Sequence, residues 1–102
     1  MKHAVGPVLR MCDEMELVIR AIRDDNPVDS VEVVDYGAYV RVQRPSVLRV
    51  TRASLERYLG ANFQMSQLES IMSAFAGRIE TSSDEMVWHL KGAAAADPEN
   101  GR

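Results

Sequence analysis

The sequence predicts a single α+β domain in which helices pack on antiparallel sheet, with the elements in the order β-α-βββ-αα-ββ. Three observations lead to this prediction. Segments in which apolar and polar residues alternate are interspersed with segments in which apolar residues recur at helical spacing. Ser or Asp followed three residues later by Glu marks the start of two helices. The chain has 102 residues, 46% of them hydrophobic, which is enough for one hydrophobic core that needs no disulfide or metal to stabilise it.

The first elements are a strand and a helix. Residues 4–11 (AVGPVLRM) are mostly apolar, but Pro7 cannot donate a hydrogen bond to a neighbouring strand, so we expect an edge strand. Asp13 followed by Glu16 then predicts a capped helix. Its apolar face is built from residues at helical spacing, namely Met15, Val18, Ile19 and Ile22.

A turn and a three-stranded meander follow. The helix should stop before Pro27, because the residue that precedes a proline disfavours the helical conformation. Alternation then predicts three strands, over residues 30–35, 39–43 and 48–50, with Arg41 pointing outward. The acidic residues beside the turn, Asp24, Asp25 and Asp29, are interpreted as a solvated helix terminus. Calcium binding would need the spacing of an EF-hand and its closing Glu, which are missing.

Two helices and two strands complete the domain. Thr51 opens a short helix that Gly60 closes. Ser66 and Glu69 form a capping box for the next helix, and Gly77 supplies the left-handed residue that ends it. The apolar stripe of this helix consists of Leu68, Ile71, Met72 and Phe75. Strands are expected over residues 77–81 and 85–91, which ends the domain of residues 1–91. Residues 92–102 are expected to form a disordered tail.

The composition excludes several classes of protein. Twelve basic and fifteen acidic residues give a net charge of −3, which argues against binding to nucleic acid. No apolar run approaches the roughly 20 residues that cross a bilayer, and no signal peptide is seen. The single cysteine suits a reducing compartment. We therefore expect a cytoplasmic protein that binds neither nucleic acid nor membrane.

No motif for catalysis, metal binding or cofactor binding stands out. Cys12, His3 and His89 fall on different elements, and His89 should face solvent on the last strand. Cys12 has no visible base or orienting partner, and no glycine-rich phosphate loop is present. The chemistry of the residues therefore indicates a binding or regulatory module.

Four segments resemble one family of regulatory proteins. These segments are residues 5–10 (VGPVLR), 25–27 (DNP), 38–41 (AYVR) and 55–79, and together they span residues 4–91 in the family's order. The chain is similar to the effector, or coupling, proteins of bacterial multicomponent diiron monooxygenases (MmoB/DmpM-like). Within that family it most resembles the toluene and alkene monooxygenase branch. Only three residues precede the first predicted strand, so we expect no counterpart of the long N-terminal arm of the methane-type regulators, which orders on docking.

The resemblance implies a protein without catalytic residues, metal or cofactor of its own. Such a protein docks on a diiron hydroxylase and tunes oxygen activation, substrate access and coupling. The reaction is the hydroxylation or epoxidation of aromatic or alkene hydrocarbons. Electrons reach the hydroxylase from a reductase, which carries FAD and an iron–sulfur cluster, often through a Rieske ferredoxin.

The resemblance also implies which residues dock. The segment expected to lie against the hydroxylase is Ser73, Ala74, Phe75, Ala76 and Gly77, whose small side chains allow close approach. Further candidates are Asn26 and Pro27 in the turn and Gly6, Pro7 and Arg10 in the first strand. Each has a simpler explanation as tight packing, turn chemistry or edge-strand chemistry. For Phe75 the apolar stripe favours the core, whereas the resemblance favours the interface.

Two other functions remain open at this point. A stand-alone α+β domain could sense a small metabolite in a pocket of a few hundred Å³ between helices and sheet. An RNA-binding sheet would need exposed aromatic side chains and a basic sheet face.

Overall fold

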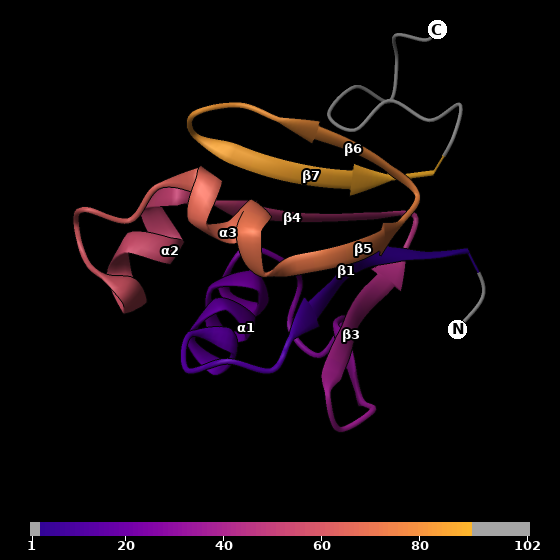
Figure 1. Cartoon of the computed structure of the whole chain (residues 1–102). Coiled ribbons are helices and arrows are strands. Elements are labelled where there is room, and N and C mark those ends of the chain that lie inside the picture. Colours follow the sequence, from indigo (N-terminus) through magenta and orange to yellow (C-terminus); the bar gives the residue numbers. More distant parts are fainter. Residues whose placement is uncertain (1–2, 91–102) are drawn as a thin grey trace, which may run out of the picture.

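Residues 3–90, which the computed structural model describes, form seven strands and three helices (Figure 1). The elements are β1 (Ala4–Arg10), α1 (Met15–Asp24), β2 (Glu32–Asp35), β3 (Tyr39–Pro45), β4 (Val47–Thr51), α2 (Arg52–Leu59), α3 (Met65–Ile71), β5 (Met72–Ala76), β6 (Arg78–Thr81) and β7 (Glu85–His89). The prediction of an α+β fold is confirmed, with one strand, β5, more than expected. The predicted tail, residues 92–102, lies outside the described residues.

The strands form two antiparallel sheets. One sheet has four strands in the order β2-β3-β1-β5, and the other has three in the order β4-β7-β6. The chain passes from the first sheet to the second through single residues, Ser46 and Gly77, whose φ angles are +71° and +94°. The expected meander is wrong for its third strand. Ser46 turns the chain out of the first sheet, so that β4 pairs with β7 instead of β3.

Strand β1 is central in its sheet, and the expectation of an edge strand is wrong. It lies between β3 and β5. Val5 pairs with Arg44 and Val8 with Arg41, but Gly6 and Pro7 between them have no pairing partner in β3. The ladder is therefore interrupted where Pro7 has no N–H to donate. That interruption lets a proline occupy a central strand.

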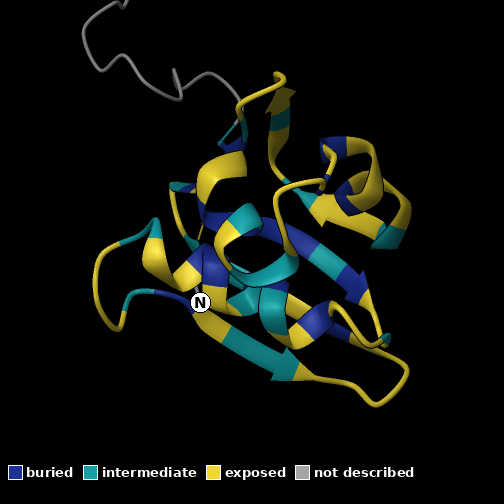
Figure 2. Cartoon of the chain, turned by 90° about the vertical axis from the view of Figure 1, so that its left-hand side faces the viewer, coloured by how far each residue is buried: buried dark blue, intermediate teal, exposed yellow. Residues whose placement is uncertain are grey.

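The core lies between the two sheets and the helices, and its residues come from nearly every element (Figure 2). Helix α1 packs against α2 and β4. The largest fully buried side chains are Trp88, Leu9, Ile22, Leu48, Leu55, Leu68, Met86, Val5, Val18, Val40, Val42 and Val50. Of the predicted apolar face of α1, Val18 and Ile22 are fully buried, Met15 is buried and Ile19 is half-buried, and Arg41 of β3 is exposed as predicted.

The helix caps agree with the sequence in one case and differ in two. Thr51 accepts a hydrogen bond from the backbone N–H of Ser54 at 3.2 Å, and Gly60 ends α2, as predicted. The capping box of Asp13 and Glu16 is absent. Helix α1 starts one residue later than that box requires, and the N–H of Met15 donates to the carbonyl of Cys12 at 3.2 Å. A backbone carbonyl, and not the Asp13 side chain, therefore accepts the hydrogen bond at the start of the helix.

Helix α3 begins two residues earlier and ends much earlier than predicted. The carboxamide oxygen of Gln67 accepts from the N–H of Gln64 at 2.8 Å, in place of the expected box of Ser66 and Glu69. The helix stops at Ile71, and Met72–Ala76 becomes strand β5. Residues 73–76 (Ser, Ala, Phe, Ala) include only one large apolar side chain, so the local pattern does not distinguish a strand from a helix. Pairing with β1 decides between the two.

Candidate functional site

The predicted docking segment forms an exposed strand at the edge of the four-stranded sheet. Strand β5 pairs with β1 on one side, and no described strand pairs with its other side. Ser73, Ala74 and Phe75 are exposed, and Ala76 is half-buried. An edge strand without a charged side chain presents backbone N–H and C=O groups that a partner can cover. The segment therefore has the form of a contact surface.

Phe75 corrects the expectation that the helical stripe placed it in the core. Its exposed fraction is 43%, and it does not belong to the core cluster. The stripe ends at Met72 because the helix ends at Ile71, and Phe75 then follows the geometry of a strand. The remaining interpretation, a position near an interface, stays a prediction.

The first-strand candidates lie directly beside β5. Gly6 pairs with Ala76 and Pro7 with Phe75, and both Gly6 and Pro7 are buried. Arg10, at the end of β1, is exposed, and its guanidinium donates to the carbonyl of Ser70 at the end of α3. Gly6 and Pro7 thus lie beside the exposed strand within the sheet, whereas Arg10 contacts the chain just before that strand begins.

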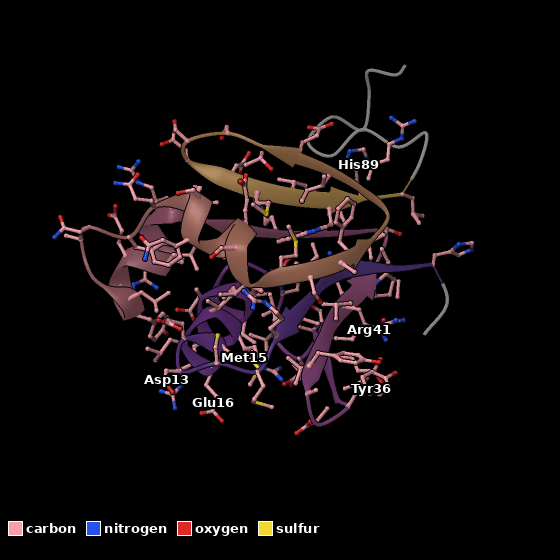
Figure 3. The ribbon with its side chains drawn as sticks, viewed as in Figure 1. Asp13, Met15, Glu16, Tyr36, Arg41 and His89 are labelled. Atoms are coloured by element: carbon pink, nitrogen blue, oxygen red, sulfur yellow. The ribbon has the colours of Figure 1, made fainter. Side chains whose placement is uncertain are left out.

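Gly77 closes this segment at a crowded corner. Its φ of +94° is a conformation that L side chains rarely adopt, and an added Cβ would lie 2.7 Å from the carbonyl oxygen of His89. His89 itself is only 5% exposed, so its expected position facing solvent is wrong. Its ring nitrogens lie 3.0 Å from the carboxylate of Glu80 and 3.0 Å from the carbonyl oxygen of Leu90 (Figure 3). His89 is therefore a buried, hydrogen-bonded residue of the packing around Gly77.

Asn26 and Pro27 lie apart from β5, because their turn is attached to the other sheet. The amide of Asn26 donates to the carbonyls of Ile22 and Arg49, and its oxygen accepts from the N–H of Arg49 at 3.2 Å. Arg49 belongs to β4, so the Asn26 side chain holds the end of α1 against the three-stranded sheet. Pro27 is exposed. The structure does not bring this pair together with Ser73–Gly77.

The two aspartates before Asn26 are also engaged, which corrects their interpretation as a solvated terminus. Asp25 accepts from the N–H and hydroxyl of Thr51 at 2.7 and 3.1 Å and from the hydroxyl of Ser54 at 2.8 Å. Asp24 accepts from the hydroxyl of Tyr58 at 2.6 Å and the guanidinium of Arg57 at 2.9 Å. The hydrogen bond to Asp24 raises the pKa of Tyr58. The two carboxylates tie α1 to α2.

Replacing Asp25 with alanine tests this tie. The substitution leaves three donors around the start of α2 without their acceptor, so we expect the free energy of unfolding to fall by about 1–3 kcal/mol. Chemical denaturation followed by circular dichroism measures it. Asp13→Ala, which removes an exposed carboxylate of the same chain, should change the free energy by less than about 0.5 kcal/mol. Equal losses in the two variants would contradict the role of Asp25.

The described part of the chain offers no metal cluster, and its hollows are open at the surface. Residues 3–90 contain no group of three His, Cys, Asp or Glu side chains able to hold a metal ion. A surface hollow of about 240 Å³ lies between α1 and β2, and another of about 190 Å³ lies over the three-stranded sheet. The hollow over the three-stranded sheet is lined by Val47, Arg49, Glu80, Thr81, Ser82, Glu85 and Val87. None of the described helices has the length and apolar character needed to cross a membrane.

Comparison with known proteins agrees on one family. The model of the MmoB/DmpM family matches residues 3–89. The effector subunit of the alkene monooxygenase system of Xanthobacter autotrophicus (strain ATCC BAA-1158 / Py2) is 42% identical over 90 residues, which cover 88% of this chain and 89% of that protein.

Solved structures share the fold. A chain of the phenol hydroxylase–regulatory protein complex superposes with a TM-score of 0.78 and 22% identity, covering 86% of this chain and 99% of that chain. The regulatory protein B of soluble methane monooxygenase superposes with a TM-score of 0.67 and 21% identity, covering 89% of this chain and 67% of that chain.

Proposed function

Because the chain belongs to the MmoB/DmpM family, we propose that it is the effector of a multicomponent monooxygenase and docks on the diiron hydroxylase of that system. The effector itself is not an enzyme. It tunes oxygen activation, substrate access and coupling while the hydroxylase hydroxylates or epoxidises an aromatic or alkene hydrocarbon. The observation that carries the docking proposal is the exposed, uncharged edge strand β5 with its small side chains.

The effector acts by shifting a population of hydroxylase conformations. A protein that carries no electrons changes a rate only by binding one conformation of its partner more tightly than another. Moving an equilibrium from mostly inactive to mostly active takes about 5 kcal/mol of differential binding. Contact with an ordered surface can supply such a difference, and β5 is held in place by its ladder with β1.

The docking surface centres on Ser73–Gly77. The small side chains of Ser73, Ala74 and Ala76 let a helix of the hydroxylase approach the strand closely, and Phe75 offers an exposed apolar side chain at the edge. A standard interface takes about 800 Å² from each partner, more than a strand of five residues provides. Neighbouring residues such as Arg10 therefore contribute, and Pro27, which lies elsewhere, is a weaker candidate.

The remaining components follow from the same assignment. A reductase with FAD and an iron–sulfur cluster, and possibly a Rieske ferredoxin, delivers electrons to the diiron centre of the hydroxylase. The single cysteine, a free thiol of intermediate exposure, suits the cytoplasm in which we place this system.

Titrating the purified chain into its cognate hydroxylase and reductase tests the proposal. We expect the turnover of an alkene or aromatic substrate to rise and to saturate near one effector per hydroxylase active site. The control is the same titration with chain that has been unfolded by heat. A turnover that stays flat over the titration would contradict the proposed function. A thermal shift of the free chain with a small metabolite would favour a sensing domain instead.

A further inference from the structure

The outer face of the four-stranded sheet carries a row of side chains that continues from the docking strand. Antiparallel pairing aligns Ala74 of β5 with Val8 of β1, Val8 with Arg41 of β3, and Arg41 with Val34 of β2. Residues paired across antiparallel strands share a face of the sheet. Ala74 and Arg41 therefore lie on one face, about 10 Å apart at two strand spacings. Arg41 and the docking strand can contact the same partner.

This face is open to solvent over β5, β1 and β3. The exposed side chains Ala74 and Arg41 flank the half-buried Val8. Figure 3 shows Arg41 pointing away from α1, which lies on the other side of the sheet. The opposite face holds Val40 and Val42 in the core, whereas the row of Ala74, Val8, Arg41 and Val34 contains no buried residue. Ala74 and Val8 give a low surface, and β3 supplies the long side chains beside it.

Arg41 is a cation without an internal partner. Its guanidinium forms no hydrogen bond or ion pair with the described residues 3–90, whereas the guanidinium groups of Arg49, Arg52 and Arg57 each pair with a carboxylate. The one carboxylate in the neighbouring row, Glu32, accepts from the amide of Gln43 at 2.6 Å. Arg10 adds a second positive charge at the end of β1. A chain with net charge −3 thus carries two arginines and a single carboxylate on the face that meets the docking strand.

Aromatic side chains stand next to this cation. Tyr39 pairs with Arg10 across the sheet and is 40% exposed. Its ring stacks on that of Tyr36, with the centroids 5.1 Å apart, and Tyr36 is 52% exposed. Tyr and Arg are the residue types enriched at the energetic centres of protein interfaces. The AYVR segment of residues 38–41 contributes both.

We propose that Arg41 anchors the docked complex by pairing with a carboxylate on the hydroxylase surface, with Tyr39 packed beside it. This inference rests on the proposed function and adds the chemistry of the partner. The facing surface of the hydroxylase is acidic at this point, and the docking interface extends from β5 across β1 to β3. The small side chains of Ala74 and Val8, next to Arg41, leave room for a helix of the hydroxylase that bears the carboxylate.

Reversing the charge of Arg41 tests the proposal. In the turnover titration, Arg41→Glu should raise the half-saturating effector concentration by about tenfold or more at low salt, because it replaces attraction with repulsion. The difference from the unchanged chain should shrink as salt is added, since screening shortens the reach of exposed charges. Arg41→Gln should give a smaller increase, and Arg41→Lys the smallest.

The control is Arg20→Glu, which reverses an exposed charge on α1 without touching this face. It should keep the half-saturating concentration of the unchanged chain. Circular dichroism checks that each variant is folded. If Arg41→Glu and Arg41→Gln saturate as the unchanged chain does while that chain stimulates turnover, the anchor is wrong and the effector function stands. Oligonucleotide binding by the unchanged chain that Arg41→Glu removes, without any effect on the titration, would also overturn the proposal.

Discussion

Replacing Ala74 with tryptophan is expected to abolish the stimulation of the hydroxylase while leaving the chain folded. Ala74 is exposed on the edge strand, on the face that also carries Arg41, so a large side chain finds room in the free protein. In the docked complex the same indole would hold the partner away from β5. The small side chains that allow close approach would then no longer determine the contact. Ser73→Trp, one residue earlier on the exposed strand, should have a similar effect.

The measurement is the turnover titration, together with a thermal melt of each variant. Ala53→Trp is the matched control, because it adds the same side chain to an exposed alanine of α2. It should stimulate as the unchanged chain does. Full stimulation by both Ala74→Trp and Ser73→Trp would remove β5 from the interface.

Replacing Gly6 with alanine is expected to prevent folding or to cost several kcal/mol of stability. The φ of Gly6 is +142°, and an added Cβ would lie 2.0 Å from the carbonyl oxygen of Val42. That atom belongs to the backbone of β3, which cannot move aside without breaking the sheet. Real Cβ atoms essentially never approach another atom so closely, so β1 and β3 would have to separate. Denaturation and the yield of folded protein measure the loss.

Gly37→Ala separates the steric clash from the strain of the backbone. Gly37 also has a positive φ, +92°, but an added Cβ would meet no atom within 4 Å. This variant should lose only about 1–2 kcal/mol, the cost of a left-handed conformation for an L residue. Similar stability of the two variants would show that β1 and β3 are not packed as closely as the structure indicates.

Much of the fold could be predicted from local patterns of the sequence. The face of α1 around Val18 and Ile22 and the cap at Thr51 depend on neighbours within one or two turns, and the structure confirms them. The central position of β1 depends on partners 29 to 70 residues away. No local pattern reports such pairings, and Pro7 pointed to an edge strand.

The structure of the docking segment also depends on a long-range pairing that local sequence patterns do not report. So short a segment with one aromatic side chain among small ones fits the end of a helix or a short strand, and pairing between β5 and β1 decides for the strand. Exposure of Phe75 then follows, although the helical stripe had favoured the core. The aspartates before Asn26 could not be interpreted from sequence, because their donors, Thr51 and Ser54, belong to another helix. The family resemblance, by contrast, identified the function without any of these details.

The most direct test of the account is the ratio of product formed to reductant consumed by the hydroxylase and reductase, with and without the chain. We predict that the unchanged chain raises both the rate of product formation and this ratio. Ala74→Trp, added at the same concentration, should leave both near the values without effector. If the rate and the ratio stay the same whether or not the folded chain is present, the central claim of an effector that biases a diiron hydroxylase is contradicted.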